Sequence, residues 1–150
     1  MMIRKAPVWL ALMAGIVVLA GCGDDKRPPT IQVTGKVMYK KTTIPVGAMI
    51  VFHPTDPAVE KKIGGKPRGT VKEDGTYVLT MFGPDDGAPE GEYGVTIDWR
   101  MKPKTAKMSL TDEGGDVRPI LNPKYSTPAN PAFKVTVKKG DKNEFNFEVD

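Results

Sequence analysis

The sequence predicts an all-β protein, an antiparallel β-sandwich of about seven strands, from three observations. Apolar residues recur at every second position through most of the chain after residue 30, turn-forming residues separate these segments, and no apolar stripe of helical period follows residue 29. Strict alternation places one side of each segment in a core and the other in water, which is typical of antiparallel strands. Fourteen prolines and sixteen glycines, mostly between the segments, agree with this fold.

The alternating segments predict which side chains face the core. These are Val33, Val37 and Tyr39, then Ala48, Ile50 and Phe52, then Tyr77, Leu79 and Met81, then Tyr93, Val95, Ile97 and Trp99, then Phe133, Val135 and Val137, and finally Phe145, Phe147 and Val149. Their neighbours, among them Gly94 and Thr96, are expected to face water. The Asp74-Gly75 pair predicts a tight hairpin between residues 69–72 and 76–79, because these residue types accept positive φ.

Residues 1–21 have the layout of a secretory signal. Arg4 and Lys5 precede sixteen uncharged, mostly apolar residues, 6–21, which end in the small pair Ala20-Gly21. This run falls short of the roughly 20 residues that a membrane-spanning helix needs. Removing residues 1–21 takes away two positive charges, so the formal net charge falls from +4 to +2. The remaining basic residues are scattered among acidic ones, which gives no support to nucleic-acid binding.

The only cysteine of the chain follows this segment directly. Leu19-Ala20-Gly21-Cys22 resembles the lipobox of bacterial lipoprotein precursors, which implies cleavage before Cys22 and a lipid on its thiol. Two or more acyl chains make a stable anchor, whereas one chain holds only marginally. The alternative is an ordinary signal peptide or an uncleaved helix with a free thiol. In lipoproteins an Asp directly after the cysteine tends to retain the protein in the inner membrane, so Gly23 favours the outer membrane.

The chain therefore divides into a signal peptide (1–21), a short charged tether (22–29) and one domain (30–150), whose segment 100–131 forms a long loop. Four motifs between about residues 31 and 99 resemble the carboxypeptidase regulatory-like domains, which are transthyretin-like (prealbumin-like) sandwiches. They are Gly35 with Val37, Pro45 before Gly47-Ala48, Thr70 with Asp74-Gly75 and Tyr77, and Gly91 with Tyr93 and Val95. Pro45 stands one residue closer to Gly47 than the usual pattern, and these scaffold residues imply a fold without an activity.

Residues for catalysis or metal binding are scarce. His53 is the only histidine, and we expect it to face solvent or a loop at a strand end. Acidic residues gather in two places, at Asp85-Asp86 with Glu90 and Glu92, and at 112–116, where either calcium or solvated turns could account for them. Neither Ser109 nor Ser126 has an evident base as partner. We expect no metal and no cofactor.

The long loop and nearby aromatic residues are the candidates for binding. Residues 120–125 are expected to pack over an open end of the sandwich, with the alternative that the loop stays mobile. The candidate ligand-binding residues are Phe82, Trp99, Arg100 and Tyr125. The sequence thus predicts a lipid-anchored, non-catalytic β-sandwich that acts as a structural or protein-interaction module of the cell envelope, or alternatively a carbohydrate- or peptide-binding module. An esterase or peptidase accessory domain is the weakest hypothesis, because the catalytic residues are missing.

Overall fold

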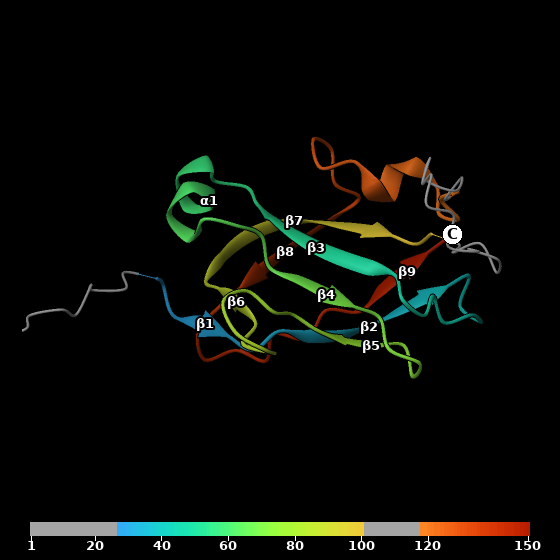
Figure 1. Cartoon of the computed structure of the whole chain (residues 1–150), viewed down its shortest axis with the longest axis horizontal. Coiled ribbons are helices and arrows are strands. Elements are labelled where there is room, and N and C mark those ends of the chain that lie inside the picture. Colours follow the sequence, from blue (N-terminus) through green and yellow to red (C-terminus); the bar gives the residue numbers. More distant parts are fainter. Residues whose placement is uncertain (1–26, 101–117) are drawn as a thin grey trace, which may run out of the picture.

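The computed structural model describes residues 27–100 and 118–150. This part of the chain contains nine strands, one α-helix and one 3-10 helix (Figure 1). In order, they are β1 (Thr30–Ile31), β2 (Thr34–Tyr39), β3 (Met49–Pro54), α1 (Pro57–Ile63), β4 (Arg68–Thr70), β5 (Thr76–Val78), β6 (Ala88–Pro89), β7 (Gly91–Asp98), η1 (Pro123–Ser126), β8 (Phe133–Val137) and β9 (Phe147–Val149).

Two sheets form the body of the molecule. One has three strands in the order β5-β2-β9, and the other has four in the order β4-β3-β7-β8 (Figure 1). Both sheets contribute to one buried core, which includes Val37 and Tyr77 from the first and Ile50 and Val95 from the second. The rings of Phe133 and Phe147, from different sheets, lie 4.9 Å apart. The predicted all-β sandwich is confirmed at this level.

The core-facing positions largely follow the predicted alternation, but the outer face of β7 does not. Thr96 is only 7% exposed, and an added Cβ at Gly94 would lie 2.6 Å from Cγ of Pro131. The prediction that Gly94 and Thr96 face water is wrong, because Pro131 and His53, from other segments, lie against them. Alternation within one strand cannot show what the rest of the chain lays over its outer side.

Strand β9 is an exception to antiparallel pairing. It runs parallel to β2, with Val37 opposite Phe147 and Tyr39 opposite Val149. The chain leaves β8 and reaches the start of β2, where Phe145 N donates to Thr34 O at 2.9 Å. Because β9 begins where β2 begins, the two strands run in the same direction. The antiparallel prediction is therefore wrong for this pair.

Two short helices, α1 and η1, add to the predicted all-β architecture. Asp56 caps α1 by accepting from Ala58 N, Pro57 is its first residue, and Gly64 ends it in the left-handed region at φ 68°. Seven residues are too few to show a helical period, and only Ile63 of them is buried. In η1, Tyr125 is buried, and Leu121 just before it also joins the core, as the predicted packing of residues 120–125 requires.

The Asp74-Gly75 turn forms as predicted, with Gly75 at φ 83° and Lys72 N donating to Thr76 O at 2.8 Å. However, β4 and β5 belong to different sheets, so this turn connects the two layers.

The two ends of the sandwich differ in what they carry. A small antiparallel pair, β1 with β6, lies at one end, together with α1 (Figure 1). The start of β7 joins these parts, since Tyr93 pairs with Pro54 and Thr55 N donates to Glu92 O at 3.0 Å. The end of β8 also lies here, because Val137 pairs with Gly91. We call this the β1 end, and the end with Trp99 the opposite end.

Candidate binding surfaces

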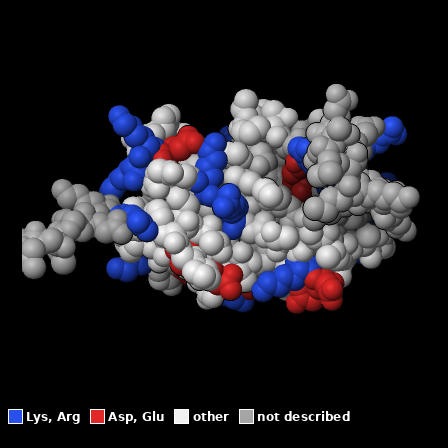
Figure 2. Space-filling model, in the orientation of Figure 1, with Lys and Arg blue, Asp and Glu red and all other residues white. Residues whose placement is uncertain are grey.

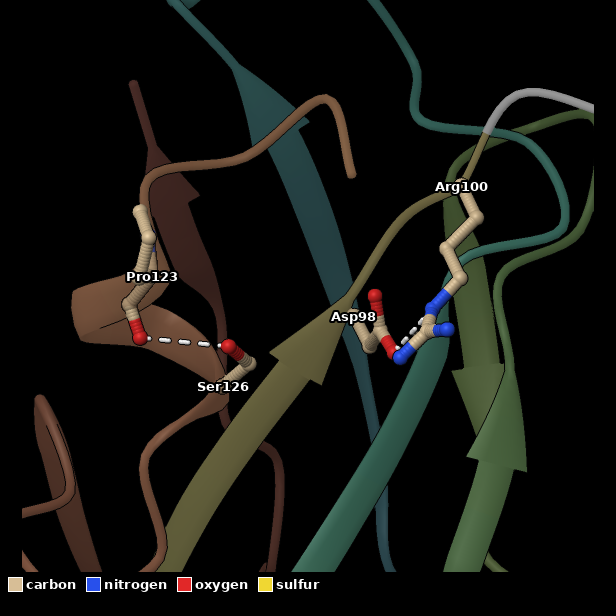
Figure 3. A network of polar contacts seen from close by, with 4 residues as sticks. All are labelled: Asp98, Arg100, Pro123 and Ser126. Carbon is tan, nitrogen blue, oxygen red and sulfur yellow. Dashed lines mark hydrogen bonds and ion pairs between the residues drawn. The ribbon is translucent and has the colours of Figure 1, made fainter. Parts of the chain in front are cut away.

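Trp99 and Arg100 lie together where β7 ends. The Trp99 ring packs edge-on against Tyr39 with centroids 5.6 Å apart, and its Nε1 donates to Val46 O at 3.1 Å. The Arg100 guanidinium folds back to the Asp98 carboxylate, at 2.7 Å between Nε and Oδ2 (Figure 3). Trp99 is therefore a half-buried rim residue of the core, as its place on the apolar face of β7 predicts, and Arg100 is exposed beside it.

Tyr125 is held inside the structure. Its ring stacks on Phe133 with centroids 5.8 Å apart, and its hydroxyl bonds to the Asp150 carboxylate. Lys124 completes this contact with an ion pair of 2.8 Å to Asp150. Ser126 Oγ donates to Pro123 O at 3.1 Å and closes the 3-10 turn (Figure 3). This cluster fastens η1 to the C-terminal residue, so the Tyr125 ring is a packing element.

Phe82 lies apart from the other three candidates. The guanidinium carbon of Arg27 sits 5.5 Å from the centroid of the Phe82 ring, which places Phe82 close to the start of β1. The Phe82 amide also donates to Asp86 Oδ2 at 3.0 Å. The structure brings Trp99 and Arg100 together at the opposite end and leaves Phe82 at the β1 end. The four predicted residues therefore do not form one site.

A groove beside Trp99 was missed by sequence reasoning. Val46 and Met49 are 49% and 50% exposed, and both line one hollow of about 740 Å³. The sequence feature that could have indicated this groove is Met49, an apolar residue at a position that alternation assigns to water. We call this hollow the edge groove.

The edge groove runs along the side where the two sheets meet. Arg68 and Thr80 exchange two backbone hydrogen bonds of 3.0 and 2.8 Å. The close approach of β4 to β5 depends on Gly69, because an added Cβ at Gly69 would lie 2.6 Å from Val78 O. Four charged side chains of both signs also line the hollow: Arg68, Lys72, Glu73 and Asp85. Exposed apolar side chains with charged groups around them suit reversible binding of a partly apolar ligand.

A second hollow, of about 870 Å³, lies over the outer face of the three-stranded sheet. Its charges are of both signs, and some are paired: Lys41 lies 4.0 Å from Glu148, and the Glu144 carboxylate is 2.5 Å from the Lys142 ammonium. Paired, exposed charges make this face an ordinary solvated sheet surface.

His53 points to the outer side of β3 and lies against β7. Its Nε2 is 2.8 Å from Thr96 Oγ1, and its Nδ1 is buried with no hydrogen-bond partner among the described residues. Burial lowers the pKa of His53, the positive charge of Lys66 lowers it further, and Glu60 opposes the shift. The Thr96 hydroxyl is within reach of this imidazole, but Thr96 is only 7% exposed, and no described side chain orients the imidazole through Nδ1 as a third catalytic group would.

The acidic residues near the β1 end serve the chain itself. Asp86 accepts from the backbone amides of Met81, Phe82 and Gly83 at 2.7, 3.0 and 3.0 Å, and Glu90 accepts from Lys139 N at 3.2 Å. Within residues 27–100 and 118–150, no group of three or more His, Cys, Asp or Glu side chains is arranged to hold a metal ion. The acidic residues at 112–116, as well as Ser109 and Cys22, lie outside the described residues.

In the part of the chain that the structure describes, no helix is long and apolar enough to cross a membrane. The fold and its surfaces define a β-sandwich protein with an exposed edge groove. Comparisons with protein-family models, curated proteins and solved structures find no match to this chain.

Proposed function

We propose that this chain is a bacterial lipoprotein, anchored through a lipid on Cys22, whose non-catalytic sandwich acts as a structural or protein-interaction module in the cell envelope. The observation that carries the proposal is the Leu19-Ala20-Gly21-Cys22 motif after an apolar segment, with the first strand beginning only eight residues after the cysteine. All the described strands therefore belong to the part of the chain that would remain after cleavage before Cys22. The further assignment to the transthyretin-like, carboxypeptidase regulatory-like domains rests on the four sequence motifs and belongs to the same proposal.

The side chains that could serve in catalysis support a non-catalytic role. His53 Nε2 contacts Thr96, Ser126 donates to Pro123 O, and the Asp86 carboxylate binds three backbone amides. Each group thus stabilises local structure, and the one hydroxyl within reach of His53, that of Thr96, is only 7% exposed.

Lipid attachment is tested by expressing the full chain with Cys22→Ser. We expect the wild-type protein to fractionate with membranes and its N-terminal peptide to carry acyl mass, because the thiol is the attachment point. The variant is expected to keep its leader and carry no acyl mass. Gly23→Ser is the matched control, since it changes the neighbouring residue and leaves the thiol. The proposal is contradicted if the mass of the intact wild-type protein shows a free Cys22 thiol and an uncleaved leader.

The membrane is tested separately. Gly23 after Cys22 favours the outer membrane, so Gly23→Asp is expected to move the lipoprotein toward the inner membrane in a density-gradient separation. Lys26→Asp is the control, because it adds negative charge to the tether away from the sorting position. Wild-type protein found in the inner membrane would reverse the proposed location.

A second candidate function is carbohydrate or peptide binding in the edge groove. It is favoured by Val46 and Met49, the two exposed large apolar residues of the described ranges, which line one hollow beside the Trp99 contact with Val46 O. Exposed apolar surface of this kind marks binding sites when it is contiguous. Arg100 lies at the same end of β7 as Trp99, whereas Phe82 and Tyr125 lie outside this groove.

The test is a thermal-shift screen of the protein against oligosaccharides and short peptides. A ligand that raises the melting temperature of the wild type is expected to lose its effect on Met49→Ser, because the variant removes exposed apolar surface from the groove. Met38→Ser, in the hollow over the other sheet, is the control. If no sugar or peptide shifts the transition, the binding hypothesis loses its support and the structural role stands.

A further inference from the structure

A basic segment begins in the last turn of α1 and continues to the start of β4. Residues 61–68 read Lys-Lys-Ile-Gly-Gly-Lys-Pro-Arg, which places four cations in eight residues without a carboxylate. Lys61 and Lys62 form the last turn of α1, where positive charge is favourable because the helix dipole is negative at that end. Helix stability thus accounts for Lys61 and Lys62 in part, but it does not account for Lys66 and Arg68, which lie outside the helix.

These cations are exposed and only partly neutralised. Lys61, Lys62, Lys66 and Arg68 all lie on the surface. Lys66 pairs with Glu60 at 3.1 Å, but no acidic partner of Lys61 or Lys62 occurs among the described residues. In Figure 2 blue side chains gather over the part of the molecule where Figure 1 shows α1, with one red group among them.

The basic segment lies at the same end of the molecule as β1, the first strand of the fold. Both α1 and β1 belong to the β1 end (Figure 1). The loop after β8 adds Lys138 and Lys139 at the same end, since Val137 pairs with Gly91 and Lys139 N donates to Glu90. The basic segment therefore lies at the end of the molecule where the described part of the chain begins.

Tether length limits how far this end can lie from a lipid on Cys22. Four residues, 23–26, lie between Cys22 and Arg27, the first described residue, so the two positions are five residue steps apart. Even fully extended, they span at most about 17 Å, which is about two Debye lengths at physiological salt. An anchored domain thus keeps its β1 end close to the headgroups in any conformation of the tether.

We infer that the basic segment 61–68, assisted by Lys138 and Lys139, docks the β1 end onto the anionic phospholipid surface beside the lipid anchor. This inference rests on the proposed attachment at Cys22. Lys and Arg side chains near an anionic leaflet are attracted to it, and the attraction is screened by salt. Docking at the β1 end directs Trp99, which lies at the opposite end, away from the membrane.

The experiment uses the lipidated full-length protein, purified from membranes and reconstituted into vesicles. A fluorophore is placed on Ala58→Cys, an exposed residue of α1, and in a separate sample on Glu73→Cys, in the turn after β4. Acylation of Cys22 leaves the introduced thiol as the only one that can be labelled. Quenching by nitroxide-labelled headgroups is compared in vesicles of phosphatidylcholine alone and with added phosphatidylglycerol.

We expect the Ala58 label to be quenched at least about twofold more than the Glu73 label in the anionic vesicles, with the excess lost at about 1 M salt. Lys61→Glu with Lys62→Glu is expected to remove the excess. Lys40→Glu with Lys41→Glu, an exposed pair at the far end of β2, makes the same charge change and should preserve it. Circular dichroism checks that both variants fold.

Equal quenching of the two labels in anionic vesicles overturns the docking inference. The proposed anchor still stands in that case if mass spectrometry shows that Cys22 is acylated. An acidic protein as the true partner gives this same result, because the vesicles contain no other protein. If mass spectrometry instead shows a free Cys22, the proposed anchor fails, and the docking inference fails with it.

Discussion

At the scale of single residues, His53 is the most informative side chain. It is the only histidine in the chain, and its Nδ1 is buried without a described partner. Because burial lowers its pKa, the folded state binds a proton less readily than the unfolded state does. The contribution of His53 to stability is therefore present above the ordinary pKa of 6.5 and is lost as the pH falls below it.

We expect the free energy of unfolding to decline between pH 7 and pH 5, and the decline to be smaller in His53→Gln. The glutamine keeps a hydrogen-bonding group near Thr96 and cannot gain a proton. Urea unfolding midpoints at several pH values measure both slopes. Equal slopes in the two proteins would show that His53 does not carry the effect.

Asp86 is the second residue with a clear energetic role. Burial opposes its ionisation, but the backbone amides of Met81, Phe82 and Gly83 outweigh this and hold the pKa of Asp86 below its ordinary value. Its neighbour Asp85 is exposed and has φ 54°. The adjacent aspartates thus form a natural pair for comparison.

Asp86→Asn is expected to lower the free energy of unfolding by about 1–3 kcal/mol, because hydrogen bonds to a charged group are lost and buried donors lose an acceptor. Asp85→Asn should stay within about 0.5 kcal/mol, since asparagine also tolerates the left-handed region. Denaturant unfolding compares the two, and similar losses would mean that the amide contacts are not the cause.

At the scale of elements, long strands were predictable and short elements were not. The apolar positions of β2, β3 and β7 follow a period of two that the sequence shows directly. In contrast, α1 depends on its caps: Asp56 at the start, Pro57 after it, and Gly64 at the end. Local capping residues were visible in the sequence, but seven residues with one buried side chain give no periodic signal.

Asp56→Ala is expected to weaken α1 by about 1 kcal/mol, because the Ala58 amide loses its side-chain acceptor. Hydrogen exchange at the Gly64 amide, which bonds to Glu60 O, should then quicken about fivefold, while exchange in β3 and β7 changes little. Asp141→Ala, in the exposed loop after β8, is the control. Unchanged exchange at Gly64 would show that α1 is held by its packing alone.

At the scale of the whole molecule, closure of the sandwich depends on contacts between distant segments. Phe145, close to the C-terminus, lies directly against Gly35 in β2: an added Cβ at Gly35 would fall 1.8 Å from Phe145 O. The Tyr77 hydroxyl donates to the same carbonyl at 2.8 Å. Only glycine fits at this crossing, so Gly35 serves close packing.

Gly35→Ala is expected to lower the free energy of unfolding by about 3 kcal/mol, because the new methyl group must displace backbone. Gly83→Ala is the matched control, since an added Cβ there meets nothing within 4 Å. Thermal or urea unfolding measures both variants. A Gly35→Ala protein as stable as the control would contradict the observed closeness of β2 to residue 145.

The sequence by itself determined the class of fold, most of the core positions and the Asp74-Gly75 turn, because alternation and turn chemistry are local properties. It also carries the motif at Cys22, which remains a proposal. Only the tertiary structure decided the parallel pairing of β9, the burial of Thr96 and the separation of Phe82 from Trp99. It alone showed the edge groove at Val46 and Met49, and it brought the basic segment to the same end as β1. These features depend on which distant segments meet, and such contacts leave no periodic trace in the chain.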